Sequence, residues 1–183
     1  MMTRKAKTTL TVLILVCTLP VVASYVTYFF WKPDSTVNYG ELLALAPVPS
    51  SAPQPLAGAA VAADGLKGRW TMVYVSGGGC DAACESSLYY MRQVRTAQGE
   101  HMERVGRLWL LDDDVAPRAE VLASYEDMSV ARANAAWQAA FAGARGHVSL
   151  VDPLGNLMLR FPANPEPKLM IKDLTRLLKY SRL

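Results

Sequence analysis

A glycine-rich turn that carries two cysteines, residues 77–84 (Gly-Gly-Gly-Cys-Asp-Ala-Ala-Cys), constrains the fold of this chain more than any other stretch. An apolar run rich in β-branched and aromatic residues, 70–75, precedes the turn, and residues 81–98 after it repeat apolar side chains at helical spacing. Glycine permits a tight loop with positive φ. The stretch therefore predicts a buried strand, a tight loop and a helix, with Cys80 at or just before the first helical turn.

The two cysteines of this turn are placed for thiol or metal chemistry. At a helix N-terminus the unpaired N–H groups and the positive end of the dipole favour a thiolate over a thiol. Cys84 lies four residues after Cys80, so two helical cysteines would share a face at a separation that a disulfide or a shared metal ion can span. We predict a reversible disulfide between them. The alternative is a helix start that simply carries two small buried residues.

The N-terminus predicts a membrane anchor. Residues 8–31 contain no charged side chain, and about 20 apolar residues suffice for a spanning helix. Arg4, Lys5 and Lys7 precede the run and predict that the N-terminus stays in the cytoplasm. The alternative is a signal peptide cleaved after Ala23, but the apolar run continues well beyond that residue.

We therefore expect a single-pass protein of the bacterial inner membrane, with its C-terminal domain in the periplasm, where paired thiols can be oxidised. Cys17 lies in the apolar run and is expected to face lipid. The anchor makes membrane lipid an expected partner. The net charge of +3 is too small to indicate a nucleic-acid partner.

Composition divides the chain into three parts. Residues 1–32 form a basic tip and the transmembrane anchor, residues 33–65 form a Pro/Ala-rich linker, and residues 66–183 form one domain of ordinary size. In the domain, strands are predicted at 70–75, 105–111, 147–151 and 157–161, and helices at 81–98, 117–125, 130–142 and after Pro167. This β-α-β-α-β-β-α order, with a closing hairpin, predicts an α/β protein with a thioredoxin-like fold.

Several motifs of the domain resemble those of one family. Leu-Lys-Gly-Arg-Trp leads into the first strand, Cys-x-x-x-Cys follows it, and a histidine precedes an Asp-Pro-x-Gly turn (66–70, Cys80, Cys84, His147, 152–155). With the N-terminal anchor, this combination resembles the SCO (SenC-type) proteins, which are membrane-anchored thioredoxin-like factors of cytochrome c oxidase assembly.

The resemblance implies a copper ion bound by Cys80, Cys84 and His147, and a metallochaperone rather than an enzyme. Soft thiolates suit Cu(I), and imidazole suits either copper state. The implied partner is cytochrome c oxidase subunit II, with its CuA site, or the assembly factors of that oxidase. The chain departs from the family at Glu85, where proline is usual, and at His147, because the family histidine would fall near Ala144.

Two other functions stay open. In a thiol–disulfide reductase, Cys80 would be the attacking thiolate and Cys84 the resolving thiol. Thioredoxins place a cis-proline before the third strand, where this chain has Gly146 and His147. The other possibility is a degenerate relative that scaffolds oxidase assembly without metal. The acidic run 112–114 is expected to be a solvated turn rather than a cation site.

Overall fold

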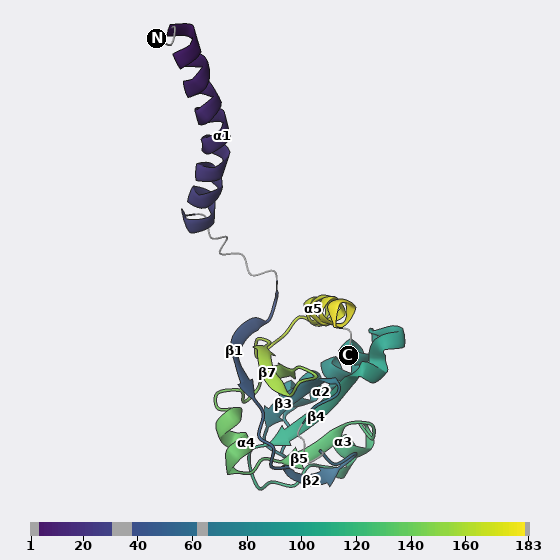
Figure 1. Cartoon of the computed structure of the whole chain (residues 1–183). Helices are drawn as coiled ribbons and strands as arrows, with labels where there is room; N and C mark the ends of the chain where they lie inside the picture. The colour runs from purple at the N-terminus through teal and green to yellow at the C-terminus, as the bar shows by residue number, and fades with distance from the viewer. Residues whose placement is uncertain (1–3, 31–37, 62–65, 182–183) are drawn as a thin grey trace. The chain divides into compact units, whose positions relative to one another are not determined.

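The computed structural model describes residues 4–30, 38–61 and 66–181, and the chain forms two compact units, residues 1–37 and 38–183. The first unit contains helix α1 (Arg4–Phe30), with Pro20 inside it and no buried residue (Figure 1). Its mean hydropathy of 2.2 over 18 residues makes α1 long and apolar enough to cross a membrane. The helix is thus a candidate anchor, as predicted, although Trp31 lies outside the described residues.

The second unit is built on one mixed sheet of seven strands in the order β1-β7-β6-β3-β4-β5-β2 (Figure 1). Strands β3, β4 and β5 are parallel, whereas β6 runs antiparallel to β3, β7 to β6, β1 to β7 and β2 to β5. The strands are β1 (Glu41–Pro47), β2 (Gln54–Ala57), β3 (Trp70–Ser76), β4 (Val105–Leu111), β5 (Ser129–Arg132), β6 (Val148–Val151) and β7 (Asn156–Arg160).

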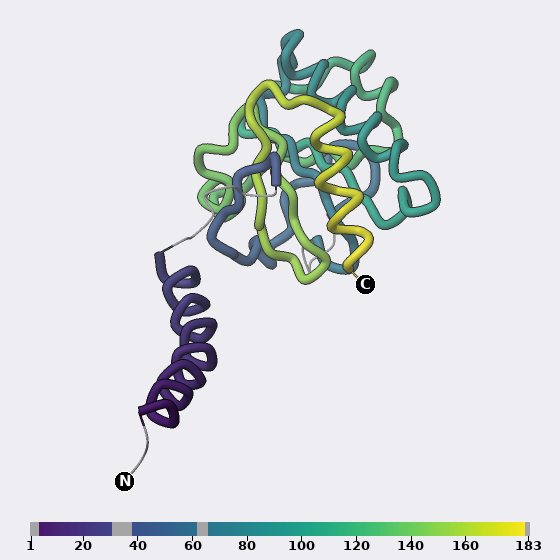
Figure 2. The backbone as a smooth tube through the Cα atoms, turned by 90° about the horizontal axis from the view of Figure 1, so that it is seen from above, coloured from purple at the N-terminus to yellow at the C-terminus, as the bar shows by residue number. Residues whose placement is uncertain are grey.

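Helices cover both faces of this sheet. Apolar side chains of α2 and α5 pack into one core with Trp109 of β4, and side chains of α4 pack into a second core with Val73 of β3. Figure 2 shows the yellow helix α5 lying along the sheet. The helices of this unit are α2 (Ala82–Thr96), the 3₁₀ helix η1 (Gly99–Arg104), α3 (Ala119–Ala123), α4 (Ala135–Ala140) and α5 (Pro167–Tyr180).

The predicted order of strands and helices holds for most of the domain. Strand β4 has the predicted bounds, and β3, β6, β7, α2 and α5 lie within a few residues of theirs. The sheet has the predicted parallel half with a crossover helix, followed by the β6–β7 hairpin and the closing helix α5. These are the parts of the chain whose apolar periodicity is strong.

The linker predicted over 33–65 is corrected by two edge strands. Residues 41–47 pair with β7 as β1, and residues 54–57 pair with β5 as β2. Pro47 ends β1 and Pro55 lies inside β2. Proline lacks an N–H donor but is accepted on edge strands, where one side of the backbone needs no partner. A proline-rich composition therefore did not exclude strands here.

The helix predicted over 130–142 is also corrected. Residues 129–132 form β5, and the helix α4 begins only at Ala135, after the N-cap residue Asn134. Val130 and Ala131 are buried beside β4, because β5 pairs with β4 on one side and β2 on the other. Pairing on both sides outweighs the helix propensity of an alanine-rich segment.

Candidate active site

The two cysteines lie where β3 ends and α2 begins. Residue Asp81 is the N-cap of α2, and its carboxylate accepts the N–H of Cys84 at 2.9 Å. Cys80 therefore precedes the N-cap, which agrees with the predicted position at or just before the first helical turn. Its φ of 37° is the one positive value of a non-glycine residue among the described residues. The peptide N–H of Cys80 donates to Gly77 O at 3.4 Å, which closes a tight turn.

Gly77 and Gly78 of the turn are needed for close approach and not for positive φ. A Cβ on Gly78 would lie 2.0 Å from the carbonyl oxygen of Val115, and a Cβ on Gly77 would lie 2.2 Å from Asp113 Oδ2. Neither glycine has a positive φ. The glycine loop thus packs directly against the loop that follows β4.

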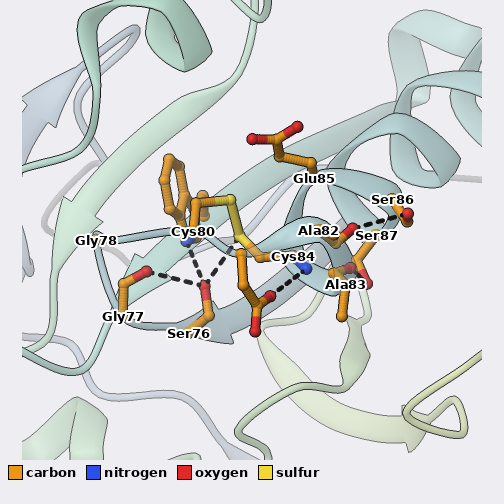
Figure 3. The surroundings of a disulfide bond; sticks show 12 residues. Ser76, Gly77, Gly78, Cys80, Ala82, Ala83, Cys84, Glu85, Ser86 and Ser87 are labelled. Carbon is orange, nitrogen blue, oxygen red and sulfur yellow. Dashed lines mark hydrogen bonds between the residues drawn. A yellow bond between two sulfur atoms is a disulfide. The ribbon is translucent and has the colours of Figure 1, made fainter.

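Cys80 and Cys84 form a disulfide, with an S–S distance of 2.02 Å and a Cα–Cα distance of 5.1 Å (Figure 3). The predicted pairing is confirmed. Cys84 lies in the first turn of α2, and both residues are buried, with 5% of Cys80 and 2% of Cys84 exposed. Both cysteines belong to the core on the α2 face of the sheet.

A pocket of about 460 Å³ opens onto the disulfide. Segments far apart in the sequence line it: the end of β3, the cysteine turn, the loop after β4 and the loop before β6. The lining residues are Tyr74, Ser76, Gly77, Gly79, Cys80, Asp81, Ala83, Cys84, Asp113, Val115, Arg145, Gly146 and Ala163. The disulfide therefore forms part of the wall of a solvent-accessible pocket, where another molecule can reach it.

A hydroxyl group lies directly against the buried sulfur. Ser76 Oγ is 3.5 Å from Cys84 Sγ and 3.4 Å from the carbonyl oxygen of Gly77. The indole Nε1–H of Trp109 donates to the same hydroxyl oxygen at 2.8 Å. Figure 3 shows the dashed lines of these contacts meeting at Ser76.

Charged side chains surround the cysteine turn. Asp113 Oδ1 accepts the N–H of Gly78 at 2.9 Å, so this carboxylate holds the glycine loop in place. Arg118 donates to the carbonyl oxygen of Cys80 at 3.1 Å and forms an ion pair with Glu85. Arg145 is 65% exposed at its side chain and pairs with Asp112 at 2.7 Å.

Tyr74 is the titratable phenol of the pocket wall. Burial raises the pKa of Tyr74 above its ordinary value, and a hydrogen bond with Ser87 partly opposes that shift. The phenol is thus neutral at physiological pH. It contributes an apolar ring and a hydroxyl to the pocket, but no charge.

His147, the third predicted copper ligand, does not line this pocket. Its Nδ1 lies 2.8 Å from the carbonyl oxygen of Phe161, which makes it a donor to the backbone there. The loop before β6 instead brings Arg145 and Gly146 to the pocket. A guanidinium is permanently protonated and has no lone pair for a metal. Within 4–30, 38–61 and 66–181, no three His, Cys, Asp or Glu side chains are grouped to hold a metal ion.

The copper site of Cys80, Cys84 and His147 therefore stays a prediction, and the residues do not assemble it as they lie in this structure. Sequence reasoning missed Ser76, Trp109, Asp113, Arg118 and Arg145. Their positions beside the disulfide follow from strand pairing and loop packing, so no local spacing indicates them. The run 112–114 was expected as a solvated turn, but its first two carboxylates bind Arg145 and the glycine loop.

A family model described as the transmembrane-like, thioredoxin-like, C-terminal domain matches residues 70–181. The match covers the cysteine turn and all of the sheet except its two edge strands β1 and β2. No curated protein sequence matches the chain.

Several solved structures share the fold of this chain. Yeast Sco1 with copper bound superposes with a TM-score of 0.58 at 14% identity, over 80% of this chain and 96% of that one. The dsbF protein of MTB, in mixed oxidised and reduced forms, superposes with a TM-score of 0.54 at 16% identity, over 74% and 98%. The thioredoxin domain of a thiol-disulfide oxidoreductase from Bacteroides vulgatus gives 0.51 at 14% identity, over 78% and 99%. At these identities the comparisons show the thioredoxin-like fold.

Proposed function

The chain belongs to the family of transmembrane-like, thioredoxin-like C-terminal domains, and from that premise we propose that it exchanges thiols and disulfides through Cys80 and Cys84. The single observation that carries the proposal is a disulfide in the wall of an open pocket, at the start of a helix. Redox partners must reach the sulfur atoms, and the pocket provides that access.

The exchange takes two balanced steps in the reduced domain. The Cys80 thiolate attacks one sulfur of a substrate disulfide, and the substrate S–S bond breaks as its other sulfur leaves as a thiolate. The Cys84 thiolate then attacks Cys80 Sγ, which releases the second substrate thiolate and closes the Cys80–Cys84 disulfide. Two electrons pass to the substrate, whose thiolates take up protons from solvent. A dithiol donor returns the domain to its reduced form.

The two cysteines differ in how firmly they are held, which assigns their roles. Cys80 lies in the loop before α2, so it can move toward a substrate without unwinding the helix. Asp113 holds the same loop at Gly78. Cys84 is fixed in the first turn of α2 through Asp81 and lies deeper in the core. Cys80 is therefore the attacking cysteine and Cys84 the resolving one.

Copper handling is the second candidate, and a specific observation favours it: the copper-bound Sco1 structure superposes over most of this chain. Reduced Cys80 and Cys84 would supply two thiolates, which are suitable ligands for Cu(I). One observation argues against copper handling. The loop in which the family histidine was expected brings Arg145 and Gly146 to the pocket instead. Cytochrome c oxidase as a partner, and a bacterial periplasmic location, belong to the same proposal and depend on the resemblance and on the basic N-terminus.

Trapping of a mixed disulfide tests the exchange function. The full chain in detergent, with Cys17→Ala in every variant, is reduced and then mixed with oxidised glutathione. In Cys84→Ser we expect a stable glutathione adduct on Cys80, detected by mass spectrometry, because no resolving thiol removes it. The parent should instead release glutathione and re-form its disulfide. A parent that stays reduced, or a Cys84→Ser variant without an adduct, would contradict the proposal.

Copper titration separates the two candidates. The reduced parent is titrated with Cu(I) against a competing chelator, beside Cys80→Ser and His147→Ala. One tightly held copper ion, weakened by both substitutions, would place copper handling first. Weak binding that His147→Ala leaves unchanged would support thiol exchange, since the two thiolates alone then account for it.

A further inference from the structure

The hydroxyl of Ser76 is the polar side-chain group in contact with the buried sulfur of Cys84. Ser76 is the last residue of β3 and only 8% exposed, and Trp109 of the neighbouring strand β4 is completely buried. The hydroxyl oxygen lies 2.8 Å from Trp109 Nε1, 3.5 Å from Cys84 Sγ and 3.4 Å from Gly77 O.

The direction of these hydrogen bonds follows from the chemistry of the groups. An indole N–H can only donate, so Ser76 Oγ accepts from Trp109 and keeps its own proton for another partner. Acceptors within reach of that proton are Gly77 O at 3.4 Å, Cys84 Sγ at 3.5 Å and the phenol oxygen of Tyr74, which also hydrogen-bonds with Ser76. The sulfur of a disulfide is a weak acceptor, so the contact of the hydroxyl with Cys84 Sγ is not strong.

Reduction changes this balance. A thiolate at Cys84 carries a full negative charge on a residue that is only 2% exposed, and a buried charge is costly unless it receives hydrogen bonds. A hydroxyl that donates to an ionised acceptor makes a shorter and stronger bond than one between neutral groups. The Ser76 hydroxyl can supply this bond by rotating about its C–O bond, without moving the backbone.

We propose that Ser76, held in place by Trp109, is a positioning residue that stabilises the Cys84 thiolate when the disulfide is reduced; the proposal rests on the thiol-exchange function. The Trp109 N–H fixes the oxygen and polarises its O–H bond, because hydrogen bonds in a chain strengthen one another. Asp81 accepts the backbone N–H of Cys84, and the described hydrogen-bond contact of the Cys84 sulfur is with Ser76. This contact stabilises the Cys84 thiolate relative to its thiol.

The pKa of the Cys84 thiol measures this effect directly. In full chains carrying Cys17→Ala and Cys80→Ser, the rate of alkylation of Cys84 by iodoacetamide is followed against pH. Ser76→Ala should raise the pKa of Cys84 by about one unit, the scale of one lost charge-assisted hydrogen bond. Ser76→Thr retains a hydroxyl and should stay within a few tenths of a unit of the parent. Trp109→Phe should shift the pKa in the same direction as Ser76→Ala, but less.

Ser86→Ala is the matched control. Ser86 lies on α2, the helix that contains Cys84. Its hydroxyl donates to Ala82 O at 2.8 Å, on the exposed side of the helix (Figure 3). Its removal should leave the pKa of Cys84 unchanged. Denaturant unfolding of each of these chains shows whether the variant is folded. If Trp109→Phe does not fold, Ser76→Ala and Ser76→Thr decide the question by themselves.

Each result bears on one proposal separately. A folded Ser76→Ala chain with an unchanged Cys84 pKa would overturn the role of Ser76, even if the parent exchanges with glutathione. An equal shift in Ser86→Ala would also overturn it, because the effect would then be general to α2. The expected shift in a chain that fails to exchange would support Ser76 and defeat the exchange function instead.

Discussion

Asp173 shows how one buried side chain holds a distant segment in place. This α5 carboxylate is 3% exposed and accepts the backbone N–H groups of Tyr39 at 2.8 Å and Gly40 at 3.0 Å, just before β1. Asp173→Ala should lower the free energy of unfolding by about 1–3 kcal/mol, because a buried donor left unpaired carries that cost. Urea unfolding of the full chain in detergent, followed by tryptophan fluorescence, measures the change.

The neighbouring Lys172→Ala provides the control for that measurement, since Lys172 is exposed on the same helix. It should change the unfolding free energy by less than about 0.5 kcal/mol. Asp173→Asn keeps one acceptor oxygen and should fall between the two. If Asp173→Ala matched Lys172→Ala, the carboxylate would not be what holds the segment before β1.

At the residue scale, the chain's local pattern indicates the reactive sulfur atoms but not their surroundings. The Cys80–Cys84 pair was predicted from its spacing of four residues, from the lack of another cysteine outside the apolar run and from the expected oxidising compartment. Ser76 and Arg145 are brought to the same pocket from positions nearly 70 residues apart, through the β3–β6 pairing and the contact of Val75 with Arg145. This proximity depends on the register between strands that are far apart in the sequence. No short stretch of the sequence contains that information.

At the element scale, elements with a strong apolar period were predicted well and short edge or mixed elements were not. Strand β4 is apolar except for Arg107 and is buried along its whole length, so its bounds follow from composition. Strand β5 has four residues and joins an alanine-rich helix, so propensity favours a single long helix there. Strands β1 and β2 were hidden by their prolines, and their pairing is set by the tertiary fold.

Asn134 marks the boundary that propensity missed, and it can be tested. Its side-chain oxygen accepts the N–H of Trp137 at 3.1 Å as the N-cap of α4, and its amide donates to Ala52 O at 3.2 Å. Asn134→Ala should lower the free energy of unfolding by about 1–2 kcal/mol, the usual effect of losing an N-cap. Urea unfolding measures it, with Gln138→Ala on the exposed side of α4 as a control that should change little. Equal effects of the two substitutions would argue against capping.

At the scale of the whole molecule, a candidate membrane helix is joined to a domain whose pocket carries a disulfide. A disulfide persists where the compartment is oxidising, so the chemistry of the domain and the orientation of the helix must agree. Arg4 and Lys5 lie at the start of α1 and Lys7 one turn later, whereas the last turn of α1 contains no basic residue. This asymmetry favours a cytoplasmic N-terminus and an exported domain.

The orientation can be tested with two reporters fused to the C-terminus of the full chain in a bacterial host. Alkaline phosphatase folds only outside the cytoplasm and should be active, whereas green fluorescent protein exported in an unfolded form should be dark. Replacing Arg4, Lys5 and Lys7 with glutamate removes the basic flank and should lower the phosphatase activity, because positive charge near the first helix sets the topology. The parent fusion should also stay with the membrane fraction after carbonate extraction. A fluorescent, phosphatase-inactive pair would place the domain in the cytoplasm, where the disulfide would be reduced, and a shortened soluble product would identify α1 as a cleaved signal sequence.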